Sequence, residues 1–187
     1  WGVAGVEGKS FNQRIRTFEV DGYYMRGDWT LQGQIGMGRL DGGAANGGHA
    51  SWRGISGLLA YNVTPRIKAV ARLDYLRNDQ NGGGNLGTSF GCSVDLDDDD
   101  NCPGTIFADG RNGFGPRMLA DGSDTDGAGK GANRHALSLG LNYLYGLNTT
   151  WKIEYRIDGA NGNVFLYPDG SYRKRNELIG TSVTVAF

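Results

Sequence analysis

The feature that most constrains the fold of this chain is an alternation of apolar and polar residues at every second position. In residues 151–158, WKIEYRID, the apolar side chains of Trp151, Ile153, Tyr155 and Ile157 alternate with charged residues without a break. A period of two places successive side chains on opposite faces of a β-strand, whereas an amphipathic helix repeats at about 3.6 residues. Because the helical period is rare in this chain, the sequence predicts an all-β protein.

The same alternation extends over most of the chain. Long strands are predicted at 14–25, 28–40, 51–63, 67–77, 135–145, 151–158 and 174–187. Most of these ranges are about twice the roughly 5–6 residues of an ordinary strand, and they match the roughly 9–11 residues that a tilted transmembrane strand needs.

The connections between these segments alternate in length. Short turns are expected at 26–28, 63–66 and 146–150, and longer connections at 41–49, 79–133 and 159–171. Brief turns on one side and extended loops on the other are typical of outer-membrane β-barrels. Residues 1–187 are therefore interpreted as one barrel domain, or the C-terminal portion of one, with 79–133 as a long extracellular insertion.

Composition narrows the class of protein further. The 19 basic and 20 acidic residues give a formal net charge of -1, which gives no reason to expect a nucleic-acid partner. No run approaches the roughly 20 apolar residues of a transmembrane helix, and the mean hydropathy is -0.43. A β-barrel stays compatible with both observations, because its strands alternate and are not hydrophobic on average.

A soluble β-sandwich also alternates, so the choice of a barrel depends on further features. Aromatic residues lie beside the short turns, at Trp29, Tyr61, Tyr145 and Trp151, where a girdle at the membrane interface would be. The polar strand faces are strongly charged, which suits a wet lumen. Together with the strand lengths, these features favour an antiparallel transmembrane β-barrel. A soluble adhesive sandwich stays open as an alternative.

The chain ends on GTSVTVAF, in which Val183, Val185 and Phe187 share one strand face. This ending resembles the last strand of Gram-negative outer-membrane proteins, which the barrel-assembly machinery reads as a targeting signal. Segments such as LLAYNVTPRIKAVARLDYL and VFLYPDGSYRKRNELIGTSVTVAF are similar to the C-terminal part of a proteobacterial porin-like family catalogued as a domain of unknown function. The resemblance implies the bacterial outer membrane, with lipid, lipopolysaccharide and the assembly machinery as partners, and it names no substrate.

Seven predicted strands do not fit the even strand number of bacterial single-chain barrels. Either residues 1–8 supply a short eighth strand, or the chain is the C-terminal portion of a larger barrel. The second alternative is preferred here, because the sidedness makes 1–13 the tail of an outer loop. Since a partial barrel would leave unpaired backbone groups in lipid, the remainder of the same barrel or further copies of the chain would complete it.

The polar strand faces supply candidates for the lining of a pore. These candidates are Glu19, Asp21, Gln32, Gln34, Lys68, Arg72, Asp74, Asn142, Lys152, Glu154, Arg156 and Asp158. Because strand 135–145 lies between 67–77 and 151–158, we expect Arg72 and Arg156 to form part of a basic ladder with interleaved carboxylates. The mixed signs argue against a strong preference for anions or cations. The alternative is a salt-bridge network that fills a narrow barrel.

The longest connection holds both cysteines and a dense acidic run. In an oxidising envelope, Cys92 and Cys102 are expected to form a local disulfide. The alternative of a free thiol or a metal thiolate has less support, because the sequence offers no second cysteine pair and no histidine near Cys92 and Cys102. Between the cysteines, Asp95, Asp97 and Asp99 are candidate calcium ligands, because calcium prefers clustered oxygen atoms. The glycine and the closing glutamate of the EF-hand loop are absent, so a solvated acidic loop is the alternative.

Catalysis has little support in the sequence. His49 lies in a glycine-rich loop and His135 at a strand end, and Ser51 is too close in sequence to His49 to count as a catalytic arrangement. We therefore expect no enzyme, and no cofactor besides the candidate calcium. The expected function is passive diffusion of ions or small hydrophilic solutes through an outer-membrane pore. The alternative is a plugged barrel that presents the acidic disulfide loop to a partner or surface.

Overall fold

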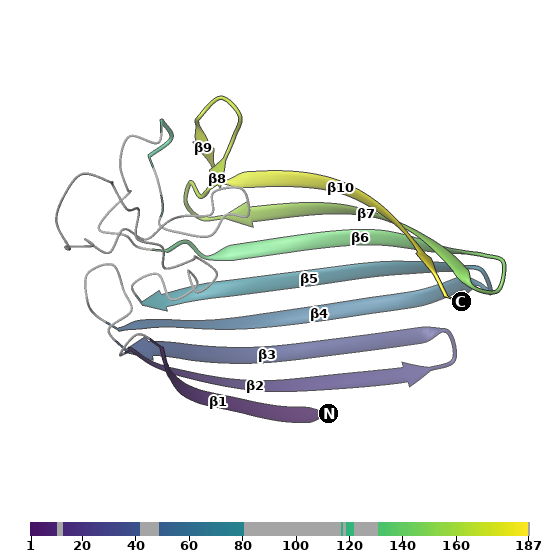
Figure 1. Ribbon diagram of the computed structural model, residues 1–187, viewed down its shortest axis with the longest axis horizontal. Coiled ribbons are helices and arrows are strands. Elements are labelled where there is room, and N and C mark those ends of the chain that lie inside the picture. Colours follow the sequence, from purple (N-terminus) through teal and green to yellow (C-terminus); the bar gives the residue numbers. More distant parts are fainter. Residues whose placement is uncertain (11–12, 42–48, 81–116, 118, 122–130, 187) are drawn as a thin grey trace.

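The computed structural model describes residues 1–10, 13–41, 49–80, 117, 119–121 and 131–186 of the 187-residue chain. Its strands (Figure 1) are β1 Gly2–Ser10, β2 Gln13–Arg26, β3 Trp29–Asp41, β4 Ala50–Thr64, β5 Ile67–Gln80, β6 Arg134–Tyr145, β7 Thr149–Ala160, β8 Phe165–Leu166, β9 Tyr172–Arg173 and β10 Arg175–Val185. The described ranges contain no helix, and therefore none that is long and apolar enough to cross a membrane. The prediction of an all-β protein is confirmed.

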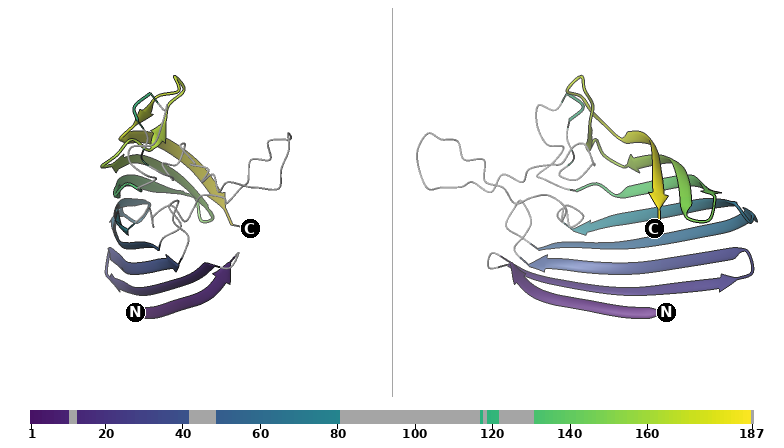
Figure 2. Two further views of the ribbon diagram at one scale, coloured as in Figure 1. Left: turned by 90° about the vertical axis from the view of Figure 1, so that its left-hand side faces the viewer. Right: turned by 45° about the vertical axis from the view of Figure 1, so that its right-hand side comes forward.

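The eight long strands form one antiparallel sheet in the order β1-β2-β3-β4-β5-β6-β7-β10. Each long strand pairs with the next along the chain, and the short β8–β9 pair is inserted in sequence between β7 and β10. The sheet curls about the direction of its strands (Figure 2). The register places β6 between β5 and β7, as the sequence predicts.

The first strand corrects one prediction. Residues 1–13 are not the tail of a loop, because β1 pairs with β2 from Gly2 opposite Asp21 to Ser10 opposite Gln13. Residues 2–10 therefore supply an eighth long strand, and an eighth strand is compatible with a chain that forms part of a larger barrel. The sequence signal is weak here because the two valines of β1 face opposite sides of the strand, and its other positions are mainly glycine, alanine or charged residues.

The short connections lie together at one end of the sheet, which we call the turn edge (Figure 1). At Gly27 and Gly146 the backbone φ is 56° and 76°, a conformation that glycine adopts without steric cost. In the β4–β5 turn, the Thr64 hydroxyl accepts hydrogen bonds from the backbone N–H groups of Arg66 and Ile67 at 3.2 and 3.0 Å. The connections between β3 and β4, between β5 and β6 and between β7 and β10 are longer and leave the opposite end, the loop edge. The connection between β1 and β2 also lies at the loop edge and spans only two residues.

The two faces of the sheet differ in chemical character. One of them, the apolar face, carries aliphatic and aromatic side chains in rows that cross several strands, such as Leu73, Leu137 and Ile157. These side chains are exposed, with Leu73 at 64% and Ile179 at 72% of full exposure. A soluble sandwich would cover such a face with a second sheet. Within the described ranges, the only other sheet is the two-residue β8–β9 pair.

The predicted antiparallel sheet is confirmed, and within the described part of the chain it is not closed into a barrel. β1 and β10 are its edges, and each pairs with one neighbour only. The sheet forms an open curved wall (Figure 2).

A cluster of buried apolar side chains lies at the loop edge and includes two residues of the segment 164–173, which we call the outer hairpin. The cluster consists of Ala132, Ala160, Val164 and Phe165, with Tyr167 packed against them. At the hairpin tip, the hydroxyl and backbone N–H groups of Ser171 donate hydrogen bonds to the Asp169 carboxylate at 2.6 and 2.9 Å. Together with the Arg173 guanidinium, these bonds hold the pKa of Asp169 below its usual range.

Candidate functional site

The polar face of the sheet is hollowed into a cavity of about 520 Å³. Its lining comes from strands β2 to β7 and from the outer hairpin. Six of the predicted pore-lining residues contribute to it: Glu19, Gln34, Arg72, Asp74, Arg156 and Asp158. Its charged side chains stand on the polar face, which we call the concave face. Residues of the apolar face also contribute to the lining, namely Phe18, Met37, Ile55, Tyr75 and His135.

Two ion pairs of the same design stand on this concave face. On β5, the Arg72 guanidinium contacts the Asp74 carboxylate at 2.9 Å, and on β7 the Arg156 guanidinium contacts Asp158 at 2.7 Å. In each pair the residues are two positions apart, so both side chains emerge on one face of a single strand. The sequence shows the repeat as RLD at 72–74 and RID at 156–158.

Strand β6 separates the two ion pairs and carries small residues at the same level. Ser138 lies between Arg72 and Arg156 in the register, and Ala136 lies between the two aspartates. Ser138 is only 6% exposed, and its hydroxyl has no hydrogen-bond partner within the described residues. Because these side chains are small, they leave room above β6 for the two guanidiniums. Arg72 and Arg156 thus form a row of positive charge, and Asp74 and Asp158 form the neighbouring row of negative charge.

Further rows of charge follow toward the turn edge. Lys68, Asn142 and Lys152 stand in one row of the register, and Glu154 lies between that row and the arginines. Asn142, Lys152 and Glu154 line a second depression of about 420 Å³. Along β5 to β7 the inner wall therefore alternates between acidic and basic rows, and this part of the predicted ladder has both signs.

The opposite side of the concave face is acidic or neutral. On β2 and β3, Asp21 stands beside Gln34 in the register, and Gln32 lies in the next row. Glu19 stands nearer the loop edge and reaches the cavity. The concave face therefore has one side, on β2 and β3, that carries carboxylates and amides, and another side, on β5 to β7, that carries most of the cationic groups.

Two aromatic residues at the loop edge of the cavity were not among the sequence candidates. Trp52 lines the cavity from β4, and Phe165 lines it from the outer hairpin. The Trp52 ring lies across Gly38, its partner in the register, where a side chain would leave no space. Only the register reveals this glycine–tryptophan contact, so the alternation of polarity in the sequence gives no signal for it.

We expect Gly38→Ala to destabilise the folded protein, because a Cβ at this position would lie 2.1 Å from the Trp52 ring. Overpacking of this kind typically costs about 1–3 kcal/mol. The midpoint of thermal unfolding in detergent, followed by tryptophan fluorescence, measures the effect. Gly36→Ala is the matched control on the same strand and face, since its Cβ would lie 3.6 Å from the nearest atom. Equal midpoints for the two variants would contradict the placement of Trp52.

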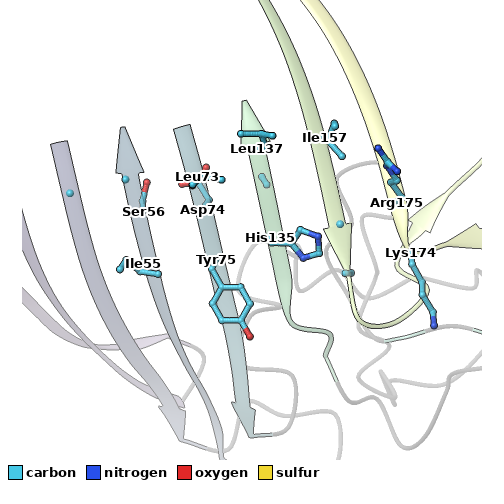
Figure 3. A pocket seen from close by; sticks show the side chains of 15 residues that line it. Ile55, Ser56, Leu73, Asp74, Tyr75, His135, Leu137, Ile157, Lys174 and Arg175 are labelled. Carbon is cyan, nitrogen blue, oxygen red and sulfur yellow. The ribbon is translucent and has the colours of Figure 1, made fainter. Parts of the chain in front are cut away.

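The apolar face carries a depression of its own, with a volume of about 1020 Å³. Apolar side chains of β4 to β7 form most of its lining, and Lys174 and Arg175 lie at its β10 end (Figure 3). His135 also belongs to this lining, and its ring covers Gly159 on the neighbouring strand. By the register His135 stands on the apolar face beside Tyr75, and it also contributes to the lining of the 520 Å³ cavity.

Several predicted sites fall outside the described residues. These are the Cys92–Cys102 disulfide, the calcium candidates Asp95, Asp97 and Asp99, and Phe187 of the assembly signal. Val183 and Val185 lie in β10 and are exposed on the apolar face, opposite Trp151 and Thr149. Within the described ranges, no group of three or more histidine, cysteine or acidic side chains is arranged to hold a metal ion.

Comparison with known proteins gives one match. The model of a protein family, described as Protein of unknown function (DUF3138), matches residues 2–187. No curated protein and no solved structure matches the chain.

Proposed function

The chain belongs to the DUF3138 family of proteins of unknown function, and we propose that its sheet forms the wall of a porin-like channel in the bacterial outer membrane. The channel would pass ions or small hydrophilic solutes by diffusion. One observation carries this proposal: a single sheet has an exposed apolar face on one side and a hollow charged face on the other. A lipid-facing exterior and a wet interior require this combination.

The apolar face has a height that suits a bilayer. On β3 it runs from Trp29 to Met37, which is about 26 Å at about 3.3 Å per residue. That length, reduced by the tilt of the strands, is comparable with the roughly 25 Å apolar band of outer-membrane barrels. At the turn edge, Trp29 and Tyr61 lie with ring centroids 4.4 Å apart, and the Trp151 indole donates a hydrogen bond to the Thr181 hydroxyl at 2.7 Å. Such amphipathic rings suit a membrane interface.

The concave face supports passage of water and ions rather than a fixed binding site. Its guanidiniums and carboxylates are paired, and they remain partly exposed to the cavity. The cationic side of the wall and the acidic side would set up a field across the lumen, which orients a dipolar solute as it passes. Mixed charge in neighbouring rows predicts only a weak preference for either ion sign.

The open edges of the sheet require a completion of the wall. Unpaired backbone groups in lipid each cost several kcal/mol, so an open sheet is not stable in a bilayer. We propose that β1 and β10 pair with further strands, from the remainder of the same barrel or from further copies of the chain. The barrel-assembly machinery would insert the wall, and β10 with its exposed Val183 and Val185 would present the signal.

A second candidate function has one observation in its favour. The outer hairpin packs a buried core at the loop edge and places Phe165 in the lining of the cavity. A barrel narrowed there by the hairpin and Trp52 would conduct poorly. It would serve instead as a structural or interaction protein that presents its outer loops to a partner or surface.

Single-channel recording of the purified native protein in a planar bilayer separates the two functions. Steady ohmic steps are the expected result for an open pore, with a small reversal potential in a salt gradient because the wall carries both signs of charge. Absence of steps from protein that is folded and inserted would contradict the channel and favour the plugged barrel. Intact mass and heat-dependent migration on a gel establish the folded state before the recording.

A further inference from the structure

A band of arginines crosses the apolar face where it meets the loop edge. Its members, which we call the outer arginine band, are Arg14, Arg16, Arg39, Arg53 and Arg77. They stand on strands β2 to β5, on the same face as the aliphatic rows and opposite to the concave cavity. The register aligns Arg16 with Arg39 and Arg53 with Arg77, so the band consists of two cross-strand pairs and one further arginine.

Each arginine of the two pairs follows an apolar residue by two positions toward the loop edge. The apolar residues are Phe18, Met37, Ile55 and Tyr75, which are between 45% and 56% exposed. Two positions along a strand correspond to about 7 Å. On each of these four strands the chemistry of this face therefore changes from apolar to guanidinium within about 7 Å.

Within the described part of the chain, the acidic partners of the band are fewer than its arginines: Glu7 contacts Arg14, and one carboxylate serves each of the two pairs. Asp41 accepts contacts from both Arg16 and Arg39 at 2.7 Å, and it also contacts His49 at 3.0 Å. Asp79 accepts contacts from both Arg53 and Arg77, at 2.8 and 2.9 Å. In each pair one carboxylate serves two guanidiniums, and the pair keeps an excess positive charge.

The geometry of each pair leaves the guanidiniums available from outside. The side chains of Arg53 and Arg77 are 60% and 56% exposed, whereas Asp79 is 24% exposed. The shared Asp79 carboxylate is less exposed than the two guanidiniums and contacts both of them. A guanidinium has five N–H donors in a planar fork, so donors remain after the contact with the aspartate. Exposed ion pairs contribute little to stability, and five arginines in one band are not explained by stability alone.

We propose that the outer arginine band binds the phosphate groups of an anionic, phosphorylated lipid in the leaflet that surrounds the apolar face. The inference rests on the proposed function, because it requires the apolar face to lie in lipid. Guanidiniums bind phosphate oxygens in bidentate fashion. Each arginine pair would take one phosphate. The two pairs are two strands apart and offset by two residues along the strands, which places them about 12 Å apart at about 4.8 Å between strands and about 3.4 Å per residue. A headgroup with two phosphates would occupy both pairs.

The surface below the band distinguishes a lipid from a free anion. Acyl chains that hang from a headgroup at the band would lie on the apolar residues in the next row. From Ile55 and Tyr75 the depression of the apolar face continues across Leu73, Leu137 and Ile157 (Figure 3). This space is lined mainly by hydrocarbon and can hold part of an acyl chain. A site for free phosphate would have no use for an apolar extension of this kind.

The test compares binding of lipid A, which carries two phosphates, with its monophosphorylated form and with inorganic phosphate, by native mass spectrometry of the detergent-purified full protein. The variant Arg16→Gln, Arg39→Gln, Arg53→Gln and Arg77→Gln removes both arginine pairs. We expect the wild-type protein to bind lipid A at least about tenfold more tightly than the variant, and more tightly than the monophosphorylated form. We also expect its affinity to fall as salt rises, because the contacts are ionic.

The double variant Arg72→Gln and Arg156→Gln is the matched control, because it removes two arginines from the concave face and none from the outer arginine band. It should bind lipid A as the wild type does. Equal affinity of the wild type and the outer variant, or equal affinity for lipid A and the monophosphorylated form, would overturn the proposal. Displacement of lipid A by inorganic phosphate at equal concentration would also overturn the proposal. If the outer variant does not fold, Arg→Lys at the same four positions keeps the charge, and binding as tight as in the wild type would contradict bidentate recognition.

Failure of this proposal and failure of the channel give different results. Lipid A binding that depends on the outer band, in a protein that does not conduct, supports the lipid site and removes the channel. Ohmic conductance with no dependence of lipid binding on the band supports the channel and removes the lipid site. The outer variant should leave the reversal potential at its wild-type value, since its arginines face away from the cavity.

Discussion

Replacing both Arg72 and Arg156 by glutamate is expected to convert a weakly selective channel into one that strongly prefers cations. In the folded protein their two guanidiniums stand in one row beside the row that carries Asp74 and Asp158. The double variant would place four carboxyl groups in these adjacent rows. A cleft of one sign raises the local concentration of counter-ions by about tenfold or more, so we expect the permeability ratio of cation over anion to rise by roughly that factor.

The reversal potential in a potassium chloride gradient measures this change. The gradient should be kept at low ionic strength, because charges are screened beyond about 10 Å at about 0.1 M salt. The variant Arg72→Lys and Arg156→Lys is the control, since it keeps the charge and loses only the planar contact with the aspartates. A charge-reversed protein that inserts and conducts with an unchanged reversal potential would show that this row does not face the path of the ions.

The alternation of polarity was sufficient to predict seven of the eight long strands and the position of β6 between β5 and β7. A period of two assigns each residue to a face, and once neighbouring strands pair antiparallel the faces have to agree. Arg72, Ser138 and Arg156 therefore fall in one row, as expected from the position of strand 135–145 between its neighbours. The apolar face followed from the same rule, including the row in which the exposed Leu73 pairs with the half-buried Leu137.

The features that the sequence did not predict depend on register or on packing outside the pattern. β1 lacks a clear alternation, and its nine-residue pairing with β2 is a property of the backbone. The outer hairpin packs its own Val164 and Phe165 in one buried cluster with Ala160 and with Ala132, which is distant in sequence. The contact between Trp52 and Gly38 appears only when β3 and β4 are aligned. The alternation of polarity also does not predict whether the edge strands β1 and β10 pair with further strands. Such pairing uses backbone hydrogen bonds, which depend little on the side chains.

The outer arginine band shows how the same pattern can mislead. Arg39, Arg53 and Arg77 occupy positions that the alternation assigns to the lipid-facing side, where a charge is unfavourable near the bilayer centre. In the structure they lie at the loop edge, beyond Met37, Ile55 and Tyr75. Depth along the strand, rather than face alone, decides whether a charge on this side is tolerated, and this dependence can be tested inside the apolar band.

Leu31→Arg should greatly reduce the fraction of the protein that folds into the membrane. Leu31 is 43% exposed on the apolar face and pairs with Leu59 on β4 and Tyr24 on β2. An arginine on the lipid face near the bilayer midplane costs about 2–4 kcal/mol. A cost of about 2 kcal/mol at this depth corresponds to roughly a 30-fold shift in the folding equilibrium. Urea titration of the protein in lipid vesicles, followed by tryptophan fluorescence, measures the change in folding free energy.

Gln32→Arg provides the matched control, because it adds the same side chain one residue along the same strand. Gln32 lies on the concave face, in the row that also contains Arg72, where a guanidinium can remain in water. If the apolar face contacts lipid and the concave face contacts water, the two variants differ in folding free energy by most of the cost of burying the charge. If the sheet belonged to a soluble protein, both positions would be exposed to water and the two arginines would have similar, small effects. Equal tolerance of both substitutions would therefore contradict the assignment of the faces, and with it the channel and the lipid site.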